Sequence, residues 1–273
     1  MCLESEWPLA PSAQGAEPLA DPPLDLDRAL EREELEVHYQ PIVELAGGRI
    51  VAVEALVRWR HPSRGLVLPS EFVPRAERTG QVLKLGRWVL GAACRQAAEW
   101  HRVRPSESPI EVTVNLSSTQ LRAPHLVNEV RDAMGAAGLD PTTLLLEITE
   151  TALARDGDGS FGALSRLRSL GVRIALDDFG TGYSSPHYLA RFPVDTMKIA
   201  KVFVDDVGAQ GREPKMARAM MRLAEVFDLR VIAEGIERSE QVPALIELGC
   251  ELGQGNHFSP PLPPDEVEPL LSA

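Results

Sequence analysis

Six apolar runs in this sequence are each followed by a charged or amide side chain. The side chains in question are Glu54, Asn115, Glu147, the adjacent pair Asp177 and Asp178, Lys198 and Glu234. A polar residue after one strand often only begins a loop, but six such ends are better explained by a shared site. Carboxylate and amide oxygens suit Mg²⁺ or Mn²⁺ and do not suit a soft metal.

Five of these side chains are carboxylates, and so many on one face would repel each other unless cations neutralised them. The adjacent pair Asp177-Asp178 gives the set enough ligands for two ions, roughly 3.5–4 Å apart as in phosphoester hydrolases. Lys198 is then the lone cation, available to a nucleophilic water or a phosphate oxygen. The pattern predicts a two-metal hydrolase site.

The elements that must hold these residues alternate between short β-rich runs and amphipathic helices. Strands are predicted at Glu36–Val43, Arg49–Trp59, Ile110–Asn115, Thr143–Thr149, Val172–Asp177, Asp195–Ile199, Leu229–Ala233 and Cys250–Gly253. Residues 44–48 are too few for a crossover, so the first two strands should form an antiparallel hairpin. The later units recur at βαβ spacing. We therefore expect an α/β fold, a modified TIM (β/α)₈ barrel with an antiparallel first strand, whose active site lies where the strands end.

Helices between the strands are predicted from apolar residues that recur every three or four positions. One stripe contains Leu85, Val89, Ala93, Ala97 and Trp100, and a second contains Met216, Met220, Leu223 and Phe227.

Composition and charge narrow the class of protein. The chain has 273 residues, and its five prolines within residues 1–24 indicate a disordered lead or linker before one domain at 25–273. A net charge of −12 argues against a nucleic acid polymer as partner. The three scattered cysteines favour a reducing compartment. Neither a signal peptide nor an apolar run of membrane-spanning length is evident, so a cytoplasmic location is expected.

The same residues lie in motifs that resemble those of the EAL family. The motifs are Tyr39-Gln40-Pro41-Ile42-Val43, Glu54-Ala55-Leu56-Val57-Arg58-Trp59, Asn115-Leu116-Ser117, Glu147-Ile148-Thr149-Glu150, Asp177-Asp178-Phe179-Gly180-Thr181-Gly182-Tyr183-Ser184-Ser185, Ala233-Glu234-Gly235-Ile236-Glu237 and Gln254-Gly255. They follow the family's order from about residue 26 to the C-terminus. One three-letter match would be weak, whereas seven in order are specific.

The resemblance implies metal-dependent hydrolysis of cyclic di-GMP to linear 5′-pGpG with two Mg²⁺ or Mn²⁺ ions. By position, Glu54, Asn115, Glu147 and Asp177 resemble the ligands of one ion. Asp177, Asp178 and Glu234 resemble those of the second, with Asp177 shared. Lys198 and Glu234 would orient the attacking water. Ca²⁺ is expected to permit binding and to inhibit hydrolysis.

The resemblance also implies contacts outside the metal set. Arg58 resembles a phosphate contact, and Gln40, Glu237 and Gln254 resemble contacts to guanine or its surroundings. Glu150 resembles the residue that supports the loop after Asp178. A homodimer and a fused or separate regulatory domain are compatible with the family.

Three positions depart from the family pattern. Ala200 replaces an aspartate that would share a strand face with Lys198 and could orient it. Pro186 replaces a leucine, and Asn256 replaces an aromatic residue. None of the three removes an expected metal ligand.

Three other functions compete with hydrolysis as explanations of the sequence. The first is a binding module that senses cyclic di-GMP without cleaving it, which would show affinity without turnover. The second is a protein kinase, because Asp178-Phe179-Gly180 matches a kinase metal-binding triplet, but the Gly-rich loop and the His-Arg-Asp loop are missing. The third is a scaffold with a solvated acidic face, which would not need Asn115 and Lys198 among its acids.

Overall fold

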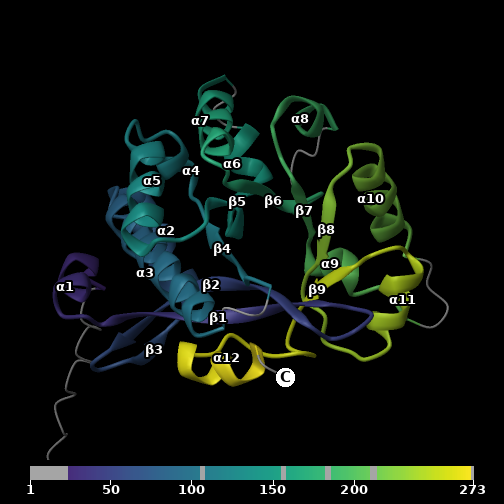
Figure 1. Ribbon diagram of the computed structural model, residues 1–273, viewed down its shortest axis with the longest axis horizontal. Coiled ribbons are helices and arrows are strands. Elements are labelled where there is room, and N and C mark those ends of the chain that lie inside the picture. The colour runs from purple at the N-terminus through teal and green to yellow at the C-terminus, as the bar shows by residue number, and fades with distance from the viewer. Residues whose placement is uncertain (1–23, 105–107, 155–157, 182–185, 210–213, 272–273) are drawn as a thin grey trace, which may run out of the picture.

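In the part of the chain that the computed structural model describes, nine β-strands form one sheet, and helices surround it (Figure 1). The structure describes residues 24–104, 108–154, 158–181, 186–209 and 214–271. The strands are β1 (Leu35–Glu44), β2 (Ile50–His61), β3 (Gly65–Val67), β4 (Glu111–Asn115), β5 (Leu144–Thr149), β6 (Arg173–Phe179), β7 (Thr196–Ile199), β8 (Arg230–Ala233) and β9 (Leu252–Gln254). The predicted lead up to residue 23, and the loop motif at residues 182–185, lie outside this described part.

β1 closes the sheet into a barrel because it pairs with both β2 and β9. Both pairings are antiparallel, whereas the other barrel strands, β2 and β4 to β9, run parallel to one another. The predicted hairpin and the reversed first strand are therefore confirmed. β3 was not predicted, because a three-residue strand gives no periodicity to detect; it pairs with the end of β2, outside the barrel.

The helices lie outside the strands (Figure 1). They are α1 (Leu26–Glu31), α2 (Pro69–Thr79), α3 (Val82–Val103), α4 (Ser118–Leu121), α5 (Leu126–Ala137), α6 (Glu150–Ala154), α7 (Asp158–Ser169), α8 (Pro186–Arg191), α9 (Lys201–Val204), α10 (Lys215–Val226), α11 (Gln241–Glu247) and α12 (Pro264–Leu271), with a 3₁₀ turn at Pro141–Thr143. The predicted stripe of α3 is buried throughout.

The helix expected from the second apolar stripe is α10, but only part of that stripe is buried. Met216 is 52% exposed, and the buried face is formed by Ala217, Met220 and Ala224. The two alanines lack long side chains, so they let this face of the helix approach the strands closely. The sequence pattern favoured the larger methionine because alanine carries little hydrophobic weight.

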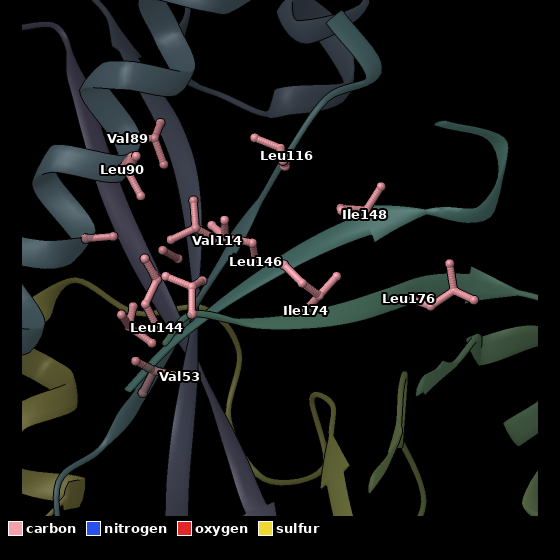
Figure 2. Packing of buried hydrophobic residues seen from close by; sticks show 14 of the residues in the cluster. Val53, Val89, Leu90, Val114, Leu116, Leu144, Leu146, Ile148, Ile174 and Leu176 are labelled. Atoms are coloured by element: carbon pink, nitrogen blue, oxygen red, sulfur yellow. The ribbon is translucent and has the colours of Figure 1, made fainter. Parts of the chain in front are cut away.

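Strand side chains alternate between a core outside the barrel and a core inside it. Val114 belongs to the large outer core, which Figure 2 shows between the strands and the α3 residues Val89 and Leu90. Its neighbour Asn115 must therefore point to the barrel's inner side. A smaller inner core consists of Ile42, Ala52, Ile232 and Leu252.

Polar layers bound the inner core at both ends of the barrel. Towards the N-terminal ends of the strands, Arg173 and Arg230 both pair with the buried Glu111. At the opposite end, two residues beyond Ala52, Ile232 and Leu252, lie Glu54, Glu234 and Gln254. Period-two alternation puts them on the same inner face as the apolar residues below. The barrel thus gathers the sequence-predicted polar residues at its mouth.

Candidate active site at the mouth of the barrel

The Lys198 ammonium lies among four carboxylates contributed by four different strands or strand ends. Its Nζ is 2.6 Å from Glu234 Oε1, 2.7 Å from Glu147 Oε2, 3.4 Å from Glu54 Oε2 and 3.9 Å from Asp177 Oδ1. Lys198 is 1% exposed. Neighbouring parallel strands bring these residues together, because Lys198 pairs in register with Ile232, two residues before Glu234.

Glu54 is held by two side-chain amides as well as by Lys198. Asn115 donates to its Oε1 at 2.7 Å, and Gln254 donates to its Oε2 at 2.7 Å. The Gln254 amide also donates to Gln40 Oε1 at 2.9 Å, and Gln40 in turn donates to the Ser259 carbonyl at 3.1 Å. Gln40 and Glu54 face each other across the β1–β2 hairpin. Two sequence-predicted substrate contacts are therefore joined to a predicted metal ligand.

Two consecutive aspartates reach the mouth because β6 contains a bulge. Between its pairings Leu176–Met197 and Phe179–Ile199, β6 advances three residues while β7 advances two. In a regular strand, the side chains of Asp177 and Asp178 would point to opposite faces of the sheet. The extra residue of the bulge breaks this alternation, so both aspartates can reach the mouth. Asp178 has a left-handed backbone with φ of 54°, a conformation that aspartate tolerates better than most residues.

The charges of the cluster do not balance. Burial alone would lower the pKa of Lys198, but Glu147 and Glu234 raise it well above its usual range. Burial and the charge of Glu54 raise the pKa of Glu147 well above its normal value, although Lys198 opposes them. Burial likewise raises the pKa of Glu234 to about 7 against the effect of Lys198. One ammonium is too little positive charge for so many carboxylates.

Glu54 and Asp178 respond differently to the same surroundings. Burial acts to raise the pKa of Glu54, but Lys198 and the hydrogen bonds from Gln254 and Asn115 lower it overall. Burial, followed by the charge of Asp177, raises the pKa of Asp178. Glu54 is thus the carboxylate whose charge the protein already compensates.

The donor set fits divalent cations. Oxygens of Asp177, Asp178 and Glu234 lie within 4.8 Å of one another. Glu147 Oε1 is buried and accepts no hydrogen bond within the described part of the chain, an expensive arrangement unless a cation completes it. These are hard oxygen ligands, as Mg²⁺ and Mn²⁺ require. The acidic cluster can bind a metal.

Glu150 lies beneath the start of the loop that follows β6. It is 2% exposed, and its Oε2 accepts from the Gly180 backbone N–H at 3.3 Å. Gly180 has φ of 97°, and a Cβ there would lie 2.1 Å from Met220 Cε, so the loop packs tightly at this glycine. Residues 182–185 of the predicted loop motif fall outside the described residues.

Arg58 and Glu237 are not joined to the cluster by any described ion pair. Arg58 is buried on the extended β1–β2 hairpin and donates to the Val57 carbonyl at 2.9 Å. Burial lowers its pKa, although Glu54 acts to raise it. Glu237 is exposed and pairs with Lys201 at 3.1 Å.

The three departures from the family pattern occupy different places in the fold. β7 ends at Ile199, so Ala200 lies outside the strand that holds Lys198. It is instead the N-cap of α9, where it makes no side-chain hydrogen bond. Pro186 is the first residue of α8, a position where the missing N–H of proline costs nothing. Asn256 is exposed.

Sequence reasoning missed a cavity of about 500 Å³ beside Asn115. Leu56, Pro69 and Leu85 line it together with polar residues such as Ser117. These residues come from β2, α2, α3 and the segment after β4, so no local pattern marks them. The one sequence signal for this cavity is that Leu56, which lines it, lies in the same motif as Glu54.

Known proteins resemble this chain along most of its length. The EAL domain model matches residues 24–261. The chain is 44% identical over 249 residues to the cyclic di-GMP phosphodiesterase NbdA of Pseudomonas aeruginosa, covering 91% of this chain and 32% of that protein. It is 40% identical over 243 residues to the bifunctional diguanylate cyclase/cyclic di-GMP phosphodiesterase MucR of the same organism, covering 89% and 35%.

A solved structure agrees with these matches. The PaMucR phosphodiesterase in complex with c-di-GMP superposes with a TM-score of 0.84 at 40% identity, covering 89% of this chain and 98% of that chain. This chain spans about a third of the length of the two curated relatives. In the described residues no helix is long and apolar enough to cross a membrane. The chain belongs to the EAL domain family.

Proposed function

We propose that this chain hydrolyses cyclic di-GMP to linear 5′-pGpG with two Mg²⁺ or Mn²⁺ ions. The observation that carries the proposal is the set of carboxylates around Lys198 at the barrel mouth. It is supported by the names of relatives at 40–44% identity and by the c-di-GMP complex of a structural neighbour.

The metal-holding residues are proposed as two overlapping sets. Glu54, Asn115, Glu147 and Asp177 would hold one ion, and Asp177, Asp178 and Glu234 the other. When bound, such ions neutralise phosphate charge and lower the pKa of a nucleophilic water. The asparagine and glutamine amides that bond Glu54 fix that carboxylate in one orientation before any ligand arrives.

Lys198 and Glu234 are proposed to orient the attacking water. The Lys198 Nζ has no freedom to leave the mouth, because Glu147 and Glu234 hold it at hydrogen-bond distance. Its ammonium can therefore present a proton to an oxygen at a fixed place. Positioning of this kind supplies much of the rate enhancement in phosphoryl transfer.

Arg58, Gln40, Gln254 and Glu237 are proposed as ligand contacts. Support comes from the hydrogen bonds that join Gln40 and Gln254 to Glu54, since a ligand touching these amides also lies next to the metal-holding residues. A guanidinium is the preferred partner of a phosphate, which suits Arg58.

Turnover of purified protein tests the proposal. The protein is incubated with cyclic di-GMP in Mg²⁺, in Mn²⁺ and in EDTA, and nucleotides are separated by chromatography. We expect 5′-pGpG in both metals and none in EDTA. Tight binding of cyclic di-GMP without product would instead support a sensor module, and the absence of both would refute this function.

The surroundings of the domain are also proposals. The matched relatives are about three times longer than the matched segment. We therefore propose that a further domain, fused or separate, controls this one. We also propose that the active form is a homodimer. The described cysteines, Cys94 and Cys250, are free and buried, which supports a reducing, cytoplasmic location.

A further inference from the structure

Gln241 is a fully buried glutamine that none of the proposed roles uses. It is the first residue of α11 and is 0% exposed. Its Oε1 accepts from the backbone N–H groups of Glu237 at 2.9 Å and Arg238 at 2.8 Å. Its Nε2 donates to the Val204 carbonyl at 2.9 Å. One side chain thus ties the loop before α11 to the end of α9.

The loop concerned joins β8 to α11 and carries Glu234 and Glu237. Its start is fixed by the Glu234 N–H, which donates to the Ile199 carbonyl at 3.0 Å. Its middle is fixed by the Ile236 N–H, which donates to the Gln254 carbonyl at 3.0 Å. Beyond Ile236, the Glu237 amide is held by the Gln241 side chain. The two halves of the loop therefore have separate anchors.

The end of α9 supplies the other side of this anchor. The last carbonyls of a helix have no partner within it. The Val204 carbonyl accepts from Gln241 Nε2 and also from the Val207 N–H at 3.0 Å, and the Arg238 guanidinium donates to the carbonyl of Asp205 at 2.8 Å. Lys201, at the start of α9, pairs with the Glu237 carboxylate. The Glu237 side chain thus contacts α9 directly, whereas its backbone is held by Gln241, which in turn bonds the end of α9.

We propose that Gln241 is a positioning residue that sets the place of Glu237 in the loop between β8 and α11. The inference rests on the proposed function, in which Glu237 contacts cyclic di-GMP. Removing the Gln241 amide leaves the N–H groups of Glu237 and Arg238 without their acceptor, and buried donors without an acceptor are costly. The loop then relaxes beyond Ile236 while Glu234 keeps its own anchor. Ligand affinity suffers and metal binding does not.

Two substitutions at Gln241 separate positioning from bulk packing. Gln241→Met keeps the volume and removes every hydrogen bond. Gln241→Glu keeps an oxygen for the two N–H groups, and in its neutral form, which burial favours, it can still donate to Val204. Met134→Ala, a buried change in α5, controls for a general loss of stability.

The geometry is tested by hydrogen exchange of residues 234–240, a readout that does not depend on activity. We expect the Glu237 and Arg238 amides to exchange about tenfold faster or more in Gln241→Met, with protection restored in Gln241→Glu and unchanged in Met134→Ala. Unchanged exchange in Gln241→Met would overturn the inference, whatever the wild type does with cyclic di-GMP.

The consequence for the ligand is tested by a double-mutant cycle with Glu237→Ala. We expect Gln241→Met to raise KM about tenfold, as for a lost charged hydrogen bond, with kcat within about threefold. If Gln241 acts through Glu237, the double variant should have the KM of Glu237→Ala alone. Additive losses would overturn the inference, whereas a wild type that neither binds nor cleaves would refute the proposed function instead.

Discussion

The Nζ of Lys198 lies 2.7 Å from Oε2 of Glu147, and both side chains are buried. The other oxygen of Glu147 accepts no hydrogen bond in the described part of the chain. The Lys198 ammonium therefore neutralises part of the negative charge at the barrel mouth. Oε1 of Glu147 is left to bind a further cation. Stability and metal binding should be linked through this pair.

Replacing Lys198 by methionine should make the fold depend on metal. Breaking a buried ion pair costs about 3–5 kcal/mol, so we expect Tm in EDTA to fall by on the order of 10 °C. Mn²⁺ should raise Tm more in this variant than in the wild type. Lys84→Met, which removes an exposed pair with Asp27, is the control and should change Tm little. Equal Tm values for wild type and Lys198→Met in EDTA would count against a countercharge role.

Metal affinity should rise with pH around neutrality. Burial raises the pKa of Glu234 to about 7 in the metal-free protein, and a ligand carboxyl must lose its proton to bind a metal. Below that pKa, metal binding must displace the proton of Glu234, so metal affinity falls about tenfold for each unit by which the pH is lowered. Titration calorimetry with Mn²⁺ at pH 6, 7 and 8 measures this, and Glu234→Gln should make the pH dependence shallower. A constant affinity across this range would show that Glu234 is not protonated or not a ligand.

Ca²⁺ should permit ligand binding and support little hydrolysis. It accepts the same oxygens but prefers longer bonds and looser geometry than Mg²⁺ or Mn²⁺, so the reacting groups are placed poorly. Affinity for cyclic di-GMP and turnover are measured side by side in Ca²⁺ and Mn²⁺. Equal turnover in the two metals would contradict the two-ion site.

Ala200→Asp should speed hydrolysis with little change in ligand affinity. An aspartate at this N-cap can accept from the first turn of α9, worth about 1 kcal/mol, and it stands next to the strand that holds Lys198. A firmer start of α9 also steadies Lys198, whose misplacement by about 1 Å can cost a hundredfold. The rate constants of the two proteins are compared after circular dichroism confirms the fold. An unchanged or lower kcat would show that Ala200 is no handicap.

The sequence was sufficient to predict the residues that lie on the barrel's inner face at the strand ends. Glu54, Asn115 and Glu147 follow apolar runs, and period two then fixes their direction. The bulge that brings Asp178 beside Asp177 could not be predicted, because it depends on how β6 and β7 register against each other. Gln241 was missed for a similar reason, since its role arises only once the loop turns back onto α9.

The most direct measurement compares wild type and Glu54→Ala for product formation from cyclic di-GMP in Mn²⁺. Lys198, Asn115 and Gln254 hold the Glu54 carboxylate in place. Glu54 belongs to neither the outer nor the inner hydrophobic core. We expect linear 5′-pGpG from the wild type and a loss of at least a hundredfold in the variant, with the fold retained. Near-normal turnover by a folded Glu54→Ala protein would contradict the assignment of this face as the metal-dependent active site.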